Sequence, residues 1–218
     1  MSDSFTYHLA ELQSVGDPSD PRRCVPSYSC SGWDVLDVGC GIGQTLVAPE
    51  FADARSRHGI DVDREAVELG KKMFPNLILT VAAAEQIPYD TARFDLVFSR
   101  VALPYTDVPV ALREIARVTK PGGRVWLALH SWQMERKTIA AASRHLAVRR
   151  LIDRIYVLVN SILLAIFDHC FARPWSGTFE SFQFARSTSR LLRRLDFEEI
   201  VEIKEPHFCV SARKAIRK

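Results

Sequence analysis

The sequence predicts an α/β fold in which a parallel sheet is covered by helices on both faces. From Trp33 onward, short apolar runs that are typical of buried strands alternate with amphipathic stretches of helical spacing. Strand, helix and strand repeated in this order favour parallel strands joined by helices that pack on the sheet. With 218 residues, 47% of them hydrophobic and 25% charged, the chain is long enough to bury one sizeable core.

The elements of this sheet can be placed along the chain by their apolar pattern. The first thirty residues are interrupted by Gly16 and several prolines and allow a helix only over 5–12, so we expect an irregular cap there. The run Lys120-Pro121-Gly122-Gly123 is expected to stop a helix before the next strand. Strands are predicted at 35–38, 58–61, 77–81, 94–98 and 125–129, helices at 45–54, 63–73, 108–118 and 187–195, and a closing strand pair at 198–203 and 208–212.

Residues 135–171 are almost free of Gly and Pro and predict one long helix or two. The first half is basic, with Arg136, Lys137, Arg144, Arg149, Arg150 and Arg154. The second half is apolar except for a narrow polar stripe at Asp153, Arg154, Asn160 and Ser161. A membrane span is excluded because Asn160 and Ser161 split the apolar stretch. A helix lying in a membrane interface fits the pattern, but we favour a lid that packs its broad apolar face on the sheet domain and covers the substrate cavity.

Charge and cysteine content limit the other classes of function. Residues 1–131 hold 13 Lys and Arg against 17 Asp and Glu, whereas residues 132–218 hold 16 against 9, so the second part favours anionic partners. Nucleic acid is not expected, because no recognised binding module accompanies the basic stretch. The five cysteines form no Cys-x-x-Cys pair and His169-Cys170 lacks further ligands, so we expect neither a disulfide framework nor a metal. No secretory signal follows Met1, and we expect a cytoplasmic protein that makes peripheral membrane contact if 135–171 is the interfacial helix.

A glycine-rich turn follows the first predicted strand. Gly39, Gly41 and Gly43 form a G-x-G-x-G pattern, and Gln44 stands where a dinucleotide fingerprint needs its third glycine. Asp37 precedes the turn, where it would repel a phosphate but could hold an ammonium group. The turn therefore favours a cationic ligand without phosphate, and Asp61 at the end of the second strand is placed to accept hydrogen bonds from ribose hydroxyls.

Six segments in order, and not the turn alone, resemble the class I S-adenosylmethionine-dependent methyltransferase family, especially its small-molecule branch. The matching segments are 35–43, 59–61, 84–88, 94–99, 112–123 and 212–214. The resemblance covers 33–131 well and 187–214 loosely. It implies a Rossmann-like, seven-stranded mixed sheet whose last strand is antiparallel, with a helical lid inserted after the fifth strand. The chain then divides into an N-terminal cap at 1–32, a cofactor-binding core at 33–131, a lid at 132–180, and a helix with the closing strand pair at 181–218.

The same resemblance implies S-adenosylmethionine as cofactor and assigns its contacts. The expected cofactor-binding residues are Asp37, Gly39, Cys40, Gly41 and Gly43 at the methionine end, Asp61 and Val62 at the ribose, Ala84 and Glu85 at the adenine, and Ser99 and Arg100 along the methionine side. Cys40 has no histidine placed near it by sequence, so we interpret it as a packing residue and not as a nucleophile.

Two departures from the family pattern affect these expectations. Ala83 stands where the family often has Asp, so Glu85 or a backbone carbonyl would have to contact the adenine amino group. Leu103-Pro104-Tyr105 replaces a stretch in which relatives often carry histidine. His130, at the end of the fifth strand, is the best remaining candidate for a general base, although a histidine hydrogen-bonded to a nearby loop fits equally well.

The sequence therefore predicts an enzyme that methylates a small, apolar or aromatic acceptor. A methyltransferase-like protein without turnover that binds a membrane surface or a ligand is the alternative, and methylation of RNA or protein is a third interpretation.

Overall fold

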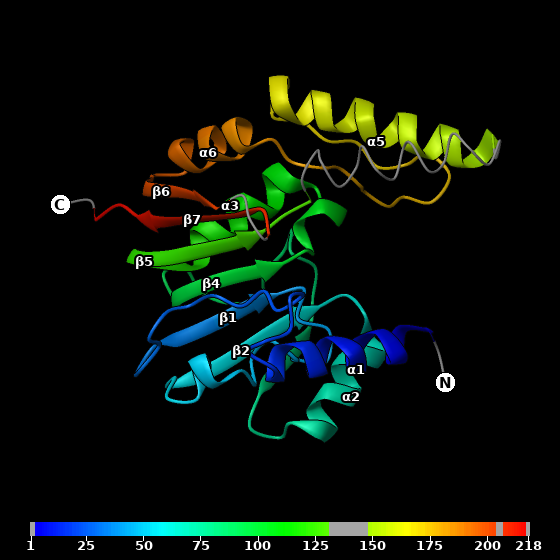
Figure 1. The fold of residues 1–218 in the computed structure, drawn as a ribbon. Coiled ribbons are helices and arrows are strands. Elements are labelled where there is room, and N and C mark those ends of the chain that lie inside the picture. Colours follow the sequence, from blue (N-terminus) through cyan, green and yellow to red (C-terminus); the bar gives the residue numbers. More distant parts are fainter. Residues whose placement is uncertain (1–2, 131–147, 204–206, 217–218) are drawn as a thin grey trace.

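The computed structural model describes residues 3–130, 148–203 and 207–216, and within them seven strands form one sheet. The strand order is β3-β2-β1-β4-β5-β7-β6 (Figure 1). The strands are β1 (Asp34–Val38), β2 (Ser56–Asp61), β3 (Ile78–Val81), β4 (Phe94–Arg100), β5 (Thr119–Ala128), β6 (Phe197–Ile203) and β7 (Cys209–Lys214). β1 to β5 run parallel, and β7 pairs antiparallel with both β5 and β6. The predicted mixed sheet with an antiparallel last strand is confirmed.

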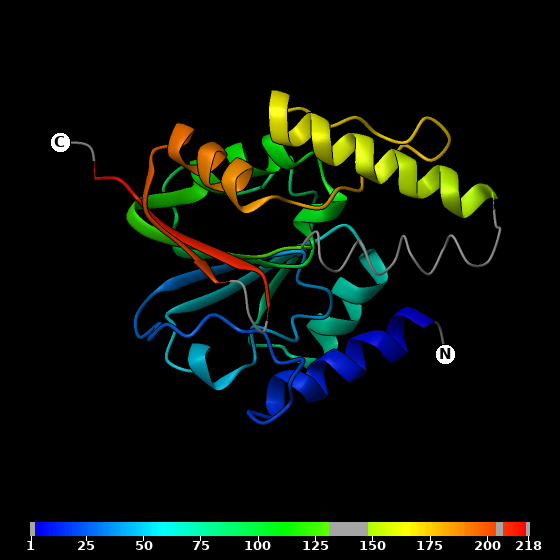
Figure 2. The same ribbon diagram turned by 45° about the horizontal axis from the view of Figure 1, so that its top comes forward.

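Helices cover both faces of this sheet, as Figure 2 shows. The helices are α1 (Asp3–Gly16), α2 (Arg64–Met73), α3 (Val108–Val118), α5 (Val148–Phe167) and α6 (Ala185–Arg194), with short 3-10 turns η1 (Pro49–Phe51) and η2 (Leu103–Tyr105). α1 and α2 lie on one side, and α3 and α6 lie on the other. α5 contacts α6 and forms an outer layer beyond that second side.

The alternation of side chains along β1 explains why both faces need cover. Leu36 and Val38 point into the core beneath α3, where they pack with Leu112. Val35 points to the opposite face and packs with Phe51 and the α2 side chain of Val67. Because both faces of the strand are fully buried, the sequence reads as a continuous apolar run, as in parallel sheets generally.

The helix predicted at 45–54 does not form. The segment is a series of turns that ends in η1, because Ala48 takes an extended conformation with φ −61° and ψ 147° before Pro49. A proline ring disfavours the helical conformation in the residue before it and removes an N–H donor. Leu46 and Phe51 are nevertheless buried, so the apolar spacing reflects packing on the sheet and not a helix.

Two other predicted boundaries shift. α1 extends over Asp3–Gly16, beyond the 5–12 that the composition allowed, so much of the N-terminal cap is regular helix. α3 ends at Val118 as predicted, but β5 begins at the next residue, and the expected breaker 120–123 lies inside the strand. Gly122 takes φ +76°, and the pairing of β4 with β5 shifts register beside it, so the glycines form a bulge and not a loop.

The long helix predicted at 135–171 is described only in part, because residues 131–147 lie outside the described residues. Its described part, α5, ends at Phe167, where Asp168 takes the left-handed conformation with φ 54°. The chain then continues without regular structure to α6. Helices in the described ranges are all too short or too polar to span a membrane.

α5 buries a mixed face and not only apolar side chains. Tyr156, Val157 and Leu164 are buried, and so are Asn160 at 0% and Ser161 at 1% exposure, whereas Ile155 and Ile162 are 53% and 42% exposed. Asn160 and Ser161 bind backbone groups of the irregular segment that follows the helix: the N–H of Phe171 donates to Asn160 Oδ1 and that of Phe182 to Ser161 Oγ. Backbone groups buried without a partner are costly, so the polar stripe faces inward.

Candidate functional site

The carboxyl ends of β1, β2 and β4 open into two adjoining cavities. The first, which we call the large cavity, has a volume of about 440 Å³, and the second, the small cavity, about 380 Å³. Both are lined by Gly39, Asp61, Ala102 and Tyr105, so they meet along these four residues. A cleft at the carboxyl edge of a parallel sheet is where open α/β folds bind ligands, and these volumes are in the range of small-molecule sites.

The glycine turn forms the floor where the two cavities meet. Gly39 takes φ +82°, and a Cβ on it would lie 2.0 Å from the Cβ of Ala102. Gly41 takes φ +55°, and a Cβ there would lie 2.5 Å from the ring of His8 in α1. Both positions therefore require glycine for conformation and for space, and the backbone of the turn stays open to a ligand.

Asp61 lies at the junction of the cavities, at the end of β2. Its Oδ2 accepts a hydrogen bond from the N–H of Gly41 at 2.8 Å, and its Oδ1 accepts one from the N–H of Asp63 at 2.9 Å. The two backbone donors fix the carboxylate in position and still leave lone pairs on both oxygens. Asp61 can therefore accept two further hydrogen bonds from a pair of neighbouring hydroxyls.

Asp37 lies behind the turn and is buried, with 1% exposure. Its Oδ1 has no hydrogen-bond partner among the described residues. Burial raises the pKa of the carboxyl from 3.8 to about 8; the charge of Asp61 adds to the rise, and the guanidinium of Arg100 opposes it. Arg100 in turn pairs with Glu11 of α1 at 2.5 Å. The result is a buried acid with an unused acceptor, which suits a cationic or hydrogen-donating ligand group and disfavours a phosphate.

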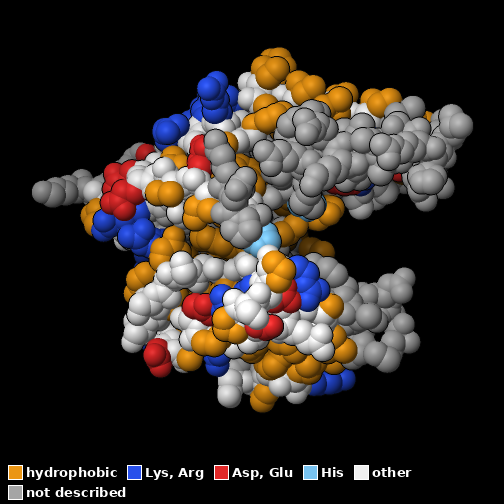
Figure 3. All heavy atoms as spheres, in the orientation of Figure 1, with side chains coloured by type: hydrophobic (Ala, Val, Ile, Leu, Met, Phe, Trp, Pro, Cys, Tyr) orange, Lys and Arg blue, Asp and Glu red, His pale blue; other side chains and the backbone are white. Residues whose placement is uncertain are grey.

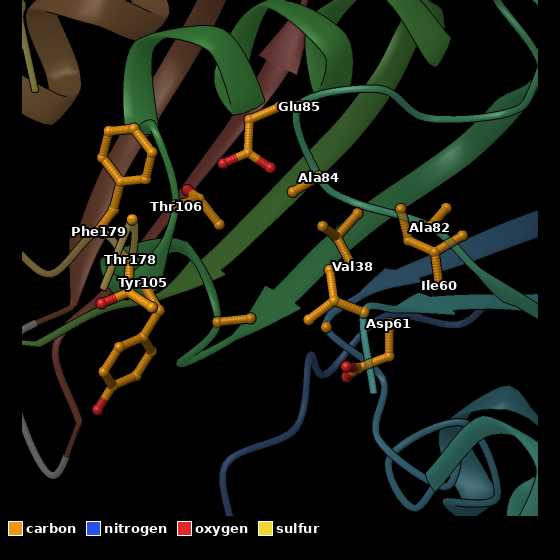
Figure 4. A pocket seen from close by; sticks show the side chains of 14 residues that line it. Val38, Ile60, Asp61, Ala82, Ala84, Glu85, Tyr105, Thr106, Thr178 and Phe179 are labelled. Atoms are coloured by element: carbon orange, nitrogen blue, oxygen red, sulfur yellow. The ribbon is translucent and has the colours of Figure 1, made fainter. Parts of the chain in front are cut away.

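The large cavity combines an apolar floor with a carboxylate at each end. Figure 4 shows Glu85 and Asp61 at opposite ends, with Val38 and Ala84 between them, and Phe179 across the cavity from these two. One oxygen of Glu85 accepts a hydrogen bond from the N–H of Asp107 at 2.8 Å, which fixes the direction of its carboxylate. The cavity can take a flat apolar ring with polar groups at its edges.

The small cavity brings two imidazoles to the same edge. It is lined by His8 from α1 and by His130, which follows β5, together with Arg100 and Tyr105. The rings of Tyr105 and His130 meet edge to face, with centroids 5.5 Å apart and planes at 86°. Val101 also lines this cavity and takes φ 62°, a strained conformation for a β-branched residue that is found most often at functional sites.

The predicted site residues divide into two groups. Those that line a cavity are Gly39, Gly41, Asp61, Val62, Ala84, Glu85, Arg100 and His130. The other four, Asp37, Cys40, Gly43 and Ser99, line neither cavity. The Ser99 hydroxyl donates to the carbonyl of Val38 at 2.8 Å and joins β4 to β1.

Cys40 and Gly43 also serve the fold. Cys40 is buried under the turn, where a Cβ on Gly59 would lie 2.7 Å from its sulfur, so it packs against β2. Gly43 faces Leu77, not the ligand space, and a Cβ there would lie 2.7 Å from a methyl of that residue. In this structure Cys40, Gly43 and Ser99 hold the turn against the sheet, and their contact with a cofactor stays a prediction.

Several lining residues were missed because they come from segments outside the matching motifs. His8 comes from α1, which also supplies Glu11 to Arg100, and the two are three positions apart and so share one helix face. That spacing is a sequence signal that could have been used. Thr178 and Phe179 come from the irregular segment after α5, and no pattern in the sequence places them beside β1.

Comparison with known proteins was consistent with this geometry. Residues 36–127 match the family described as methyltransferase domain. Over 104 residues the chain is 34% identical to an O-methyltransferase of Pyrenophora dematioidea, covering 44% of this chain and 39% of that protein. Over 105 residues it is 33% identical to a ubiquinone/menaquinone biosynthesis C-methyltransferase of Bartonella bacilliformis, covering 43% and 40%. The chain thus spans about two fifths of the length of these relatives.

Solved structures share the fold over most of the chain. A methyltransferase of Methanosarcina mazei that depends on S-adenosylmethionine matches with a TM-score of 0.59 at 18% identity, covering 88% of this chain and 96% of that chain. Another, from Mesorhizobium loti, matches with a TM-score of 0.57 at 20% identity, covering 86% and 93%. At these identities the likeness concerns the arrangement of strands and helices, which agrees with the seven-stranded order described above.

Proposed function

The chain belongs to the class I S-adenosylmethionine-dependent methyltransferase family, and from that premise we propose that it transfers a methyl group to a small, apolar or aromatic acceptor. S-adenosylmethionine is the cofactor of this family. The observation that carries the proposal is the double cavity, which is lined by the open glycine turn and by the fixed carboxylate of Asp61, with the buried, unsatisfied acid Asp37 behind the turn.

We assign the cofactor to this row by matching its groups to the side chains. The adenine fits the apolar floor of the large cavity beside Val62 and Ala84, and the ribose hydroxyls fit Asp61 at the junction. The methionine end then lies over Gly39 and Gly41, where Asp37 offers a free acceptor and Arg100, paired with Glu11, offers the charge. No phosphate has to be accommodated, which agrees with the acid behind the turn.

Glu85 can take the place of the aspartate that the family often has at the position of Ala83. One oxygen of Glu85 is occupied by the N–H of Asp107, and the carboxylate faces the large cavity. We propose that its second oxygen accepts a hydrogen bond from the adenine amino group. Burial of an adenine without that contact would leave an unpaired donor, at a cost of about 1–3 kcal/mol.

The residues around the small cavity have two tasks in methyl transfer. The bound cofactor supplies an electrophilic methyl carbon, so the chain has to hold the acceptor in line and keep water out. We propose that His130 takes the proton of an acceptor hydroxyl or activated carbon as the new bond to carbon forms, and that Tyr105 positions the imidazole through its ring edge. The matched relatives include one named for O-methylation and one for C-methylation, and a general base serves either reaction.

Calorimetry with S-adenosylmethionine tests the cofactor assignment. We expect saturable binding by the wild-type protein and about 10- to 100-fold weaker binding by Asp61→Ala, because two charge-assisted hydrogen bonds to the ribose are lost. The matched control is Asp53→Ala, an exposed aspartate in the turn before β2, at the other end of the strand. Absence of binding by the wild-type protein, or equal loss in both variants, would contradict the proposal.

The role of His130 is tested separately with labelled methyl donor and a panel of small phenols and enols. His130→Gln is expected to lower kcat by about 100-fold or more while leaving the dissociation constant of S-adenosylmethionine unchanged. The low-pH limb of the rate profile should also disappear in this variant. If kcat and the profile stay as in the wild type, His130 is a structural residue that binds a neighbouring loop.

A further inference from the structure

The outer face of α5 is an apolar stripe with no cover among the described residues. Its members are Ile152, Ile155, Val159, Ile162, Ile166 and Phe167, with exposed fractions from 42% to 68%. Figure 3 shows hydrophobic side chains gathered along this edge of the molecule, over α5. From Ile155 to Phe167 the sequence contains no charged residue, so nothing along the stripe favours water.

Hydrogen bonds on the opposite face prevent α5 from turning this stripe inward. The hydroxyl of Tyr156 donates to the carbonyl of Phe171 at 2.7 Å, and the amide of Asn160 donates to the carbonyl of Glu180 at 3.0 Å. Rotation of the helix would break these bonds and leave buried backbone groups of the irregular segment unpaired. The exposed isoleucines are therefore a fixed property of the folded chain.

Arginines lie at both ends of the stripe. The first turn of α5 contains Arg149 and Arg150 in the sequence. At the other end, α6 contacts α5 and contributes Arg190, Arg193 and Arg194, of which Arg190 and Arg194 share a single acid, Asp168. Figure 3 shows Lys and Arg side chains beside the apolar edge, over α6. The stripe thus lies between two basic ends.

We propose that the outer face of α5 docks on the surface of an anionic phospholipid bilayer. The isoleucines would enter the boundary between headgroups and acyl chains, and the arginines of α6 would contact the headgroups. A second copy of the chain fits less well: with both ends basic, parallel and antiparallel pairing of two α5 helices alike bring arginines together, and like charges across an interface are unfavourable.

Docking in this orientation has a consequence for the site. The irregular segment that α5 holds through Tyr156 and Asn160 includes Thr178 and Phe179, which line the large cavity. A bilayer bound to the outer face of α5 would therefore be separated from the wall of the large cavity by the thickness of this helix. This arrangement suits an acceptor that is an apolar molecule dissolved in the membrane. That assignment of the acceptor rests on the proposed function, whereas the docking itself does not depend on it.

Vesicle sedimentation tests the docking. The full chain should sediment with vesicles of phosphatidylserine and phosphatidylcholine in equal parts, remain in solution with phosphatidylcholine alone, and be released as salt is raised. The double variant Ile155→Asn, Ile162→Asn should lower the partition coefficient by about tenfold or more, because two apolar contacts with the lipid are lost. Its melting temperature should match that of the wild type, because both side chains are exposed. Ile216→Asn is the matched control: Ile216 is 61% exposed but lies after β7, away from α5.

The remaining outcomes separate the alternatives. Equal sedimentation of the double variant and the control, or no sedimentation of the wild type, overturns the docking. A wild-type dimer in light scattering that the double variant loses would assign the stripe to a second copy and overturn it too. If the wild-type protein sediments with vesicles as expected but does not bind S-adenosylmethionine, the docking is supported and the proposed function is rejected.

Discussion

β1 and α5 both bury apolar side chains, but α5 buries two polar side chains beside them and leaves several isoleucines exposed. Beneath the turn, β1 buries Leu36 and Val38. In α5, the buried positions include Asn160 and Ser161, and isoleucines such as Ile162 face outward. The difference lies in the neighbours: strands beside β1 pair their own backbone groups, whereas the irregular segment beneath α5 needs side chains as hydrogen-bond partners.

The comparison teaches when an apolar pattern gives the orientation of an element. Apolar side chains turn inward where the neighbouring backbone is already satisfied by regular structure. Where it is not, unpaired amides and carbonyls are costly, and polar positions that pair with them turn inward beside the apolar ones. Four variants sharpen this contrast, from the largest expected change in stability to the smallest.

Replacement of Asp37 should have the largest effect, through the pH dependence of stability. The pKa of its carboxyl is raised from 3.8 to about 8 by burial, so between these values the folded protein holds a proton that the unfolded chain releases. The cofactor-free protein should therefore lose stability as the pH rises through this window, by about 6 kcal/mol in total at about 1.4 kcal/mol per pH unit. Asp37→Asn should flatten the slope in urea denaturation from pH 5 to 8, whereas Asp53→Asn should not. An unchanged slope in Asp37→Asn would contradict the assigned pKa.

Gly39→Ala should destabilise the turn by about 3 kcal/mol, because positive φ and a clash act together. A Cβ at Gly39 would lie 2.0 Å from that of Ala102, whereas Gly32 has φ +71° with nothing within 4 Å. Gly32→Ala is therefore the matched control, because it tests the positive φ without the clash. We expect it to lower the free energy of unfolding by about 1 kcal/mol. Denaturant unfolding midpoints compare Gly39→Ala with Gly32→Ala. Equal losses of stability in the two variants would mean that the contact with Ala102 does not require glycine at position 39.

Asn160→Leu should cost about 2 kcal/mol, although it makes α5 more apolar. The change leaves the N–H of Phe171 and the carbonyl of Glu180 without their partner. Asn160→Gln, which keeps an amide at the wrong reach, should recover little of this loss. A more stable Asn160→Leu protein would show that the helix can turn its apolar face inward after all.

Ile162→Gln should have the smallest effect, below about 0.5 kcal/mol in the absence of lipid, because the side chain is 42% exposed. The measurement is thermal unfolding of Ile162→Gln beside the wild type and Asn160→Leu. A loss as large as that of Asn160→Leu would indicate that the outer face of α5 is covered in solution.

Much of the core and part of the candidate site could be predicted from the sequence. The order of strands and helices, the glycine turn and Asp61 depend on local patterns, namely apolar period, glycine spacing and an acid at a strand end. The helix expected at 45–54 failed because Pro49 outweighs apolar spacing locally. The family resemblance placed Ser99 along the methionine side of the cofactor. Its hydroxyl donates to the carbonyl of Val38, a contact that depends on how the sheet packs.

Local patterns along the chain predict the class of fold, the turn that requires glycine and the acid that disfavours phosphate, because each follows from the conformation or charge of neighbouring residues. Only the tertiary structure brought His8 over the turn and Phe179 opposite β1, since both depend on contacts between segments far apart in the chain. It also decided the face that α5 buries. That choice depends on which backbone groups of another segment lack partners, and no pattern within the helix records it.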